Sequence, residues 1–137
     1  MQTRVLSLRT GSRPAIVDLT HDAADFVHTL GRELSGLLSV FVPHATAGVA
    51  VLELGSGSDD DLLAVLDQLL PADDRYHHAH GSVGHGRSHV MPAFIAPSVV
   101  VPVLEGRLAL GTWQSIALVD LNNDNASRSV RLSFIEG

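Results

Sequence analysis

Five of the chain's eight histidines lie in one short segment, RYHHAHGSVGHGRSH, at His77, His78, His80, His85 and His89. Imidazole is the commonest metal ligand in proteins and the side chain that most readily changes its charge near neutral pH. The segment is therefore either a metal or acid/base site or a surface loop rich in histidine by composition alone. Because the chain has no cysteine, a metal would be held by His, Asp, Glu or water.

The spacing within this segment does not select a ligand set. His78 and His80 would share one face of an extended chain. His85 and His89 are four residues apart and would share one face of a helix, but the glycines on either side of His85 disfavour a helix. Three histidines completed by water form a known catalytic zinc arrangement. Several triplets remain open.

Three further positions carry groups that could take part in chemistry. His44 follows an apolar run in PHATAG, where it is either a site residue or a histidine capping a strand edge. Glu53 ends the next apolar run, where a solvated strand end is the alternative to a functional acid. Asp61 closes an acidic run, 59–61, at an expected helix start, where the helix dipole favours carboxylates.

All nine basic residues are arginine. The absence of lysine excludes Schiff-base chemistry and a P-loop lysine, so a bound anion would meet arginine, backbone N–H groups or a metal. Arg87, Arg107 and Arg128 are candidate anion contacts, whereas Arg131 lies in an alternating strand and is expected on its solvated face. Trp113, the one tryptophan, is expected to pack in the core or in a subunit interface.

The elements that must position these residues follow from apolar periodicity. The pattern predicts strands at 2–9, 15–19, 37–43, 46–53, 99–103, 108–121 and 129–135, and helices at 21–34 and 62–70. There is no regular strand–helix alternation of the kind that builds a parallel sheet. We therefore predict a single domain, 1–137, of the α+β class: a mostly antiparallel β-sandwich with two or three flanking helices.

Composition narrows the partners and the compartment. The net charge is −6, and a binder of nucleic acid or of a membrane surface would instead show a basic face. No stretch approaches the roughly 20 apolar residues of a membrane span, and the first residues do not have the pattern of a signal peptide. We expect a cytoplasmic protein.

Several motifs in chain order resemble those of one family. They are HATAG with a glutamate nine residues after its histidine, then Y-x-H, then GRSH, then VPVLEGRLALGTWQSIALVD from Val101 to Asp120. Together they cover nearly the whole chain, and the last is the most specific. The chain is similar to the YjbQ-like family, whose members are described as secondary thiamine-phosphate synthases.

The resemblance implies a homotrimer with a metal or anion site near the subunit boundaries. It implies His44, His78 and His89 as metal ligands, and Glu53 and Asp61 as the acids that assist them. The implied metal is divalent: zinc, or magnesium with a diphosphate substrate.

The implied anion contacts are Arg128 and Arg87, and Arg87 stands where the family has a histidine. The implied reaction joins hydroxymethylpyrimidine diphosphate to thiazole phosphate and releases pyrophosphate. Two alternatives are a metal-dependent hydrolase of a small phosphorylated or carboxylated metabolite, and a non-catalytic protein that binds small anions. Three departures from the family pattern are Arg87, Leu52 in place of an asparagine, and the shortened GSGS segment, which lacks two acids. Arg87 and the lost acids motivate the non-catalytic alternative.

Overall fold

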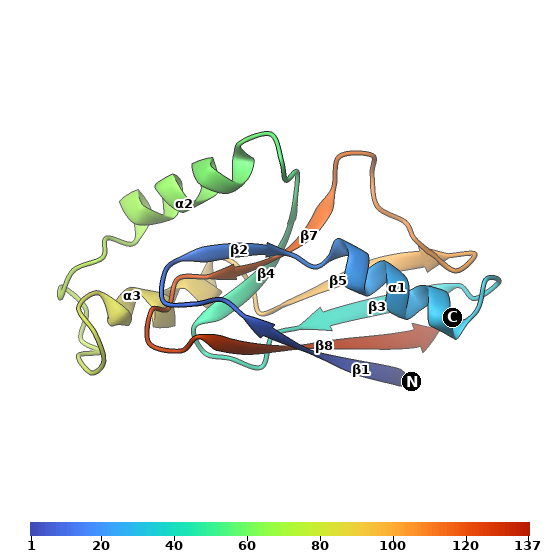
Figure 1. Cartoon of the computed structure of the whole chain (residues 1–137), viewed down its shortest axis with the longest axis horizontal. Coiled ribbons are helices and arrows are strands. Elements are labelled where there is room, and N and C mark those ends of the chain that lie inside the picture. Colours follow the sequence, from blue (N-terminus) through green and yellow to red (C-terminus); the bar gives the residue numbers. More distant parts are fainter.

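The computed structural model describes all residues, 1–137, as two antiparallel sheets with helices packed on them (Figure 1). The strands are β1 (Gln2–Arg9), β2 (Ala15–Asp18), β3 (Gly36–Phe41), β4 (Ala47–Leu52), β5 (Ser98–Leu104), β6 (Arg107–Leu108), β7 (Ser115–Asp120) and β8 (Ser127–Glu136). The helices are α1 (Thr20–Leu30), α2 (Ser58–Leu69) and α3 (His85–Val90), and a 3₁₀ turn, Met91–Ala93, follows α3. One sheet has the order β1-β8-β3-β5-β6 and the other β2-β7-β4. The predicted α+β class is confirmed.

The core lies between the two sheets. Along β8, Val130, Leu132 and Phe134 are buried while Arg131 is exposed, which is the period-two pattern of a strand with one face in the core. These side chains belong to a cluster of 16 buried residues that also draws on β3, β4, β5, β7 and α1. Burial of this apolar surface is the main stabilising contribution to the fold.

Two element boundaries differ from the sequence expectation. The predicted helix 21–34 ends at Leu30, because Gly31 adopts φ 144°. The predicted strand 108–121 is interrupted by a turn, in which the Gln114 side chain accepts the Gly111 N–H at 2.8 Å. Trp113 lies in this turn and is 73% exposed, which excludes a core position for it within the chain.

Helix α3 was not expected from the sequence, because glycines surround His85. The structure gives these glycines another role. A Cβ on Gly86 would lie 2.8 Å from the His78 carbonyl oxygen and 2.6 Å from the Tyr76 Cβ. Glycine therefore lets α3 pack directly against the preceding loop, and this packing outweighs its low helix propensity.

One end of the molecule collects several connections that are far apart in sequence. The β3–β4 turn, the β7–β8 turn and the loop between α2 and α3 all lie there, opposite both chain termini (Figure 1). A hydrogen bond of 3.3 Å from Asn122 to Thr46 joins two of these connections. None of the helices is long and apolar enough to cross a membrane.

Candidate metal centre

Four histidines converge at this end of the molecule. His78 and His80 come from the loop between α2 and α3, and His85 and His89 come from α3. One candidate ligand nitrogen from each lies within 4.8 Å of the other three. A tetrahedral zinc ion with Zn–N bonds of about 2.0–2.1 Å would hold its nitrogens about 3.3 Å apart. A small contraction of this four-histidine cluster would therefore enclose an ion.

The pair on α3 has the geometry of two ligands. Residues four apart on a helix lie on one face, and the Nε2 atoms of His85 and His89 are 2.9 Å apart. The other ring nitrogen of His85 is occupied by its neighbours. Its Nδ1 lies 2.7 Å from the Asp124 carboxylate and 3.1 Å from the Asn122 side-chain oxygen.

His78 supplies an unsatisfied ligand atom. Its Nε2 is buried and has no hydrogen-bond partner. The His78 ring centroid lies 4.0 Å from that of His80 and 3.9 Å from that of His89. Burial without a partner costs a polar group on the order of 1–3 kcal/mol. A metal ion would satisfy this atom, so the donor set fits a metal.

The local electrostatics favour neutral imidazoles. Burial lowers the pKa of His89 and of His78, and the neighbouring histidines lower both further. The backbone N–H of Ser82, with a smaller contribution from His85, lowers the pKa of Asp124. At neutral pH His78 and His89 are therefore uncharged and lie near an ionised carboxylate, and a neutral imidazole is the form that binds a metal.

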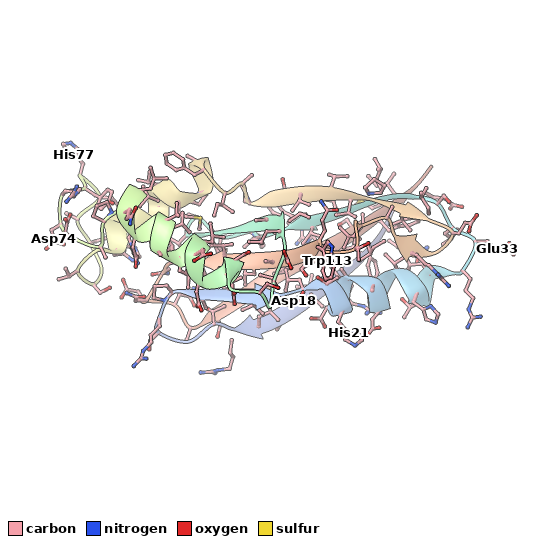
Figure 2. All side chains as sticks on the ribbon, turned by 90° about the horizontal axis from the view of Figure 1, so that it is seen from above. Asp18, His21, Glu33, Asp74, His77 and Trp113 are labelled. Carbon is pink, nitrogen blue, oxygen red and sulfur yellow. The ribbon has the colours of Figure 1, made fainter.

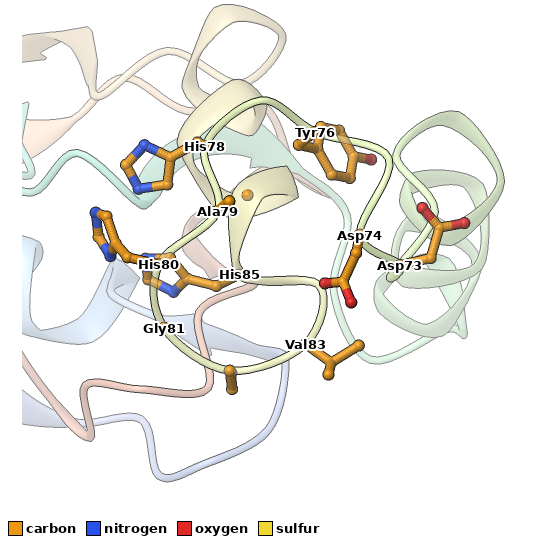
Figure 3. Close-up of a pocket in the computed structure, with 11 residues that line it drawn as sticks. Asp73, Asp74, Tyr76, His78, Ala79, His80, Gly81, Val83 and His85 are labelled. Atoms are coloured by element: carbon orange, nitrogen blue, oxygen red, sulfur yellow. The ribbon is translucent and has the colours of Figure 1, made fainter.

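A cavity of about 350 Å³ opens beside the cluster, the size of a small-molecule pocket. Figure 3 shows His78, His80 and His85 on one side and the carboxyl groups of Asp73 and Asp74 on the other. An ion pair of 2.6 Å to Arg75 engages Asp73. Asp74 is therefore the carboxylate of this rim that has no ion pair.

The structure does not bring His44 into the cluster. It lies in the β3–β4 connection, and its Nε2 accepts the Ser129 backbone N–H at 2.9 Å. Burial, together with the charge of Arg128, lowers the pKa of His44. Of the three ligands implied by the resemblance, the structure gathers His78 and His89.

His80 and His85 complete the cluster, and sequence reasoning left both outside the implied ligand set. The i,i+4 spacing of His85 and His89 was the signal for the pair on α3, and the glycines argued against it. His77 projects from the surface at the same end of the molecule (Figure 2).

The two acids expected to assist the metal lie elsewhere. Glu53 follows β4, and its Oε1 accepts the Ser56 hydroxyl at 2.9 Å. Asp61 is exposed in the first turn of α2. The histidine loop follows the opposite end of this 12-residue helix, which spans about 18 Å. Neither carboxylate therefore belongs to the cluster.

The two arginines expected to bind phosphate are buried structural residues. Arg87 is 4% exposed and joins α3 to α2 by contacts of 2.5 Å to Asp67 and 3.2 Å to the Leu70 carbonyl oxygen. Arg128 is 2% exposed and donates to Asp120 from Nε at 2.7 Å. Both guanidinium groups are already engaged by acceptors of the fold, which leaves neither open to a ligand.

Comparisons with known proteins agree on one family. The model of the family described as "UPF0047 protein YjbQ-like" matches residues 4–137. UPF0047 protein Rv2556c of Mycobacterium tuberculosis is 62% identical over 137 residues, which is 100% of both chains. The crystal structure of hypothetical protein APE1520 from Aeropyrum pernix superposes with a TM-score of 0.90 at 32% identity, covering 100% of both chains. A YbjQ-like protein of unknown function (SSO2532) from Sulfolobus solfataricus superposes with a TM-score of 0.89 at 26% identity, over 97% of this chain and 95% of that one.

These comparisons correct the expected function. The relatives are described only as UPF0047, hypothetical or uncharacterised proteins, and none is described as a thiamine-phosphate synthase. The expected synthase activity is therefore wrong. The buried arginines also remove the phosphate contacts on which that expectation relied. The family prediction itself is confirmed: with a match from residue 4 to 137 and a 62% identical relative of the same length, the chain belongs to the UPF0047, YjbQ-like family.

Proposed function

We propose that this chain binds one divalent transition-metal ion, zinc in the first place, through His78, His80, His85 and His89. The observation that carries the proposal is the buried Nε2 of His78, which has no hydrogen-bond partner and lies among three other imidazoles. The convergence of four imidazoles would by itself also be explained by hydrogen bonds among them. An unsatisfied nitrogen within the convergence calls for an electron-pair acceptor.

The donor set favours zinc over magnesium. Imidazole suits zinc and the later first-row metals, whereas magnesium prefers oxygen ligands. The four members of the cluster are all nitrogen donors. The magnesium alternative is therefore the weaker of the two metals expected from the sequence.

The exposure of the four histidines suggests different roles for them. His78, His85 and His89 are half-buried, whereas His80 is exposed at the mouth of the cavity. The three inner histidines would hold the ion, and His80 would close the fourth position or yield it to a ligand. A metal bound by three histidines supplies Lewis-acid chemistry to a ligand in its open position.

Elemental analysis of the purified protein tests the proposal. We expect about one zinc per chain after zinc loading and dialysis, loss of that zinc in His89→Ala, and full retention in His77→Ala. His77 is the matched control because it lies in the same segment with its side chain exposed. Wild-type protein without stoichiometric metal would overturn the proposal.

We also propose that the chain self-associates, with the homotrimer implied by the family resemblance as the expected state. The outer face of the β1-β8-β3-β5-β6 sheet supports this. Leu37 lies opposite Ile135 and Pro102 there, and Val100 and Leu104 on the same face are 58% and 59% exposed. Light scattering on wild type and Val100→Glu tests it: we expect a trimer that the charge dissociates, and a monomeric wild type would refute it.

A further inference from the structure

We propose that Asp124 is a positioning residue that orients His85 for metal binding. Its carboxylate accepts the His85 Nδ1–H and so directs Nε2, with its lone pair, at the other histidines. This inference rests on the proposed metal site and adds to it a residue outside the histidine segment. Asp124 lies in the β7–β8 connection, 39 positions after His85 in the sequence.

The hydrogen-bond acceptors around His85 determine its tautomer. Nδ1 faces two oxygens, Asp124 Oδ2 at 2.7 Å and Asn122 Oδ1 at 3.1 Å. An ionised carboxylate only accepts hydrogen bonds, and the Asn122 oxygen already accepts the Asp124 backbone N–H at 3.0 Å. A ring nitrogen between two acceptors must carry the proton. The neutral ring therefore has its free lone pair on Nε2, which lies 2.9 Å from His89 Nε2.

The surrounding loop holds Asp124 against His85. The same Oδ2 atom accepts the Ser82 backbone N–H at 3.0 Å, which ties it to the histidine loop. A Cβ on Gly81 would lie 2.6 Å from Asp124 Oδ2 and 2.7 Å from the His85 ring, and Gly81 has φ 87°. Only glycine allows the loop to close this tightly over the carboxylate and the imidazole.

A chain of buried hydrogen bonds anchors the β7–β8 connection to the sheets. The Asn122 side-chain amide donates to Thr46 at 3.3 Å, and Thr46 also accepts from Arg128 at 3.0 Å. Arg128 in turn pairs with Asp120, which is fully buried at the end of β7. These hydrogen bonds fix the β7–β8 connection relative to both sheets. Asp124, which lies in this connection, thereby holds His85 of the short helix α3 in a fixed orientation.

A carboxylate behind a metal-bound histidine sets the ring orientation and raises the basicity of the ligand nitrogen. Removing such a partner typically weakens metal affinity by about 10–100-fold. We therefore expect Asp124→Asn to weaken zinc binding by about that factor, measured by competition with a chromogenic chelator. Asp74→Asn is the matched control, because Asp74 is an exposed carboxylate that lines the same cavity, and we expect its affinity to stay near that of wild type.

A double-mutant cycle distinguishes positioning from a general effect of charge. In a His85→Ala background, Asp124→Asn should produce no further loss of zinc affinity, because Asp124 acts through the missing ring. An equal loss in both backgrounds would overturn the proposal, as would an unchanged affinity in the single variant.

Histidine-ring ¹⁵N NMR of the metal-free protein gives a readout that does not depend on the metal site. We expect wild-type His85 to carry its proton on Nδ1, and Asp124→Asn to shift it toward the other tautomer. A wild-type ring protonated on Nε2 would overturn the proposal even if Asp124→Asn failed to fold. Wild type without zinc affinity but with the Nδ1–H tautomer would overturn the proposed metal site and leave the orientation of His85 by Asp124 standing.

Discussion

The four-histidine cluster and the buried pair Arg128–Asp120 lie at the same end of the molecule and differ in how fully their polar atoms are satisfied. Asp120 accepts from Arg128, from the Thr10 hydroxyl at 2.8 Å and from the Asn122 backbone N–H at 2.9 Å. His78 Nε2, also buried, has no partner. Satisfied groups stabilise the fold, whereas a buried polar atom without a partner needs an explanation, which the proposed metal ion supplies. The comparison explains why the arginine expected to bind a ligand is structural, whereas the histidines remain available.

The largest expected effect comes from breaking the satisfied network. Arg128→Met leaves the fully buried Asp120 carboxylate without its ion pair, and breaking a buried pair costs about 3–5 kcal/mol. Denaturant unfolding measures this loss in the free energy of unfolding. Arg131→Met, on the exposed face of the same strand, is the control, and its effect should stay within about 0.5 kcal/mol. Equal losses in the two variants would contradict the structural role of Arg128.

The next largest effect is expected when zinc binds to the four-histidine cluster and stabilises the folded state. A ligand that binds only the folded state stabilises it by about 2.7 kcal/mol at a concentration 100 times its Kd. Zinc at that concentration should raise the unfolding free energy of wild type by about this amount and leave that of His78→Ala nearly unchanged. If zinc stabilised both proteins equally, its binding site would lie outside the cluster.

A smaller effect is expected from a substitution at Gly81, which packs against both Asp124 of the β7–β8 connection and His85 of the cluster. Gly81→Ala places a Cβ against Asp124 and His85 at a positive φ, so it should destabilise the fold by roughly 1 kcal/mol or more and weaken zinc binding. Gly55→Ala, also at positive φ but with open space around it, should destabilise the protein without changing zinc affinity. Equal zinc affinities for the two variants would show that closure of the loop at Gly81 does not contribute to zinc binding.

The smallest effect is a pH dependence at His44. Burial lowers its pKa in the folded state below 6.5, so between these two pKa values the unfolded chain binds more protons. The contribution of His44 to stability is therefore complete above about pH 6.5, is lost as the pH falls toward the folded-state pKa, and is constant below it. His44→Gln should show a shallower loss than wild type between about pH 7 and 5 in metal-free protein. Parallel profiles would show that His44 stays uncoupled from folding.

Much of the fold could be predicted from the sequence because its signals are local. Alternation in SVRLSFI places β8, and its buried residues are the alternate apolar positions. The histidine segment was also visible as the region of interest. Two of the proposed ligands were not selected, because the direction of His80 and His85 depends on a loop closed by Gly81 and Asp124. Periodicity carries no information about such closure.

The α+β class, the family, the exclusion of cysteine chemistry and the segment that contains the proposed metal ligands all follow from the amino-acid sequence alone. Which histidine nitrogens converge, and which charged groups already have partners, became evident from the three-dimensional arrangement. Arg87 lies within the histidine segment in the sequence, yet its partners, Asp67 and the Leu70 carbonyl, come from the preceding helix and its end. The physical reason is that desolvation and hydrogen-bond satisfaction depend on neighbours in space.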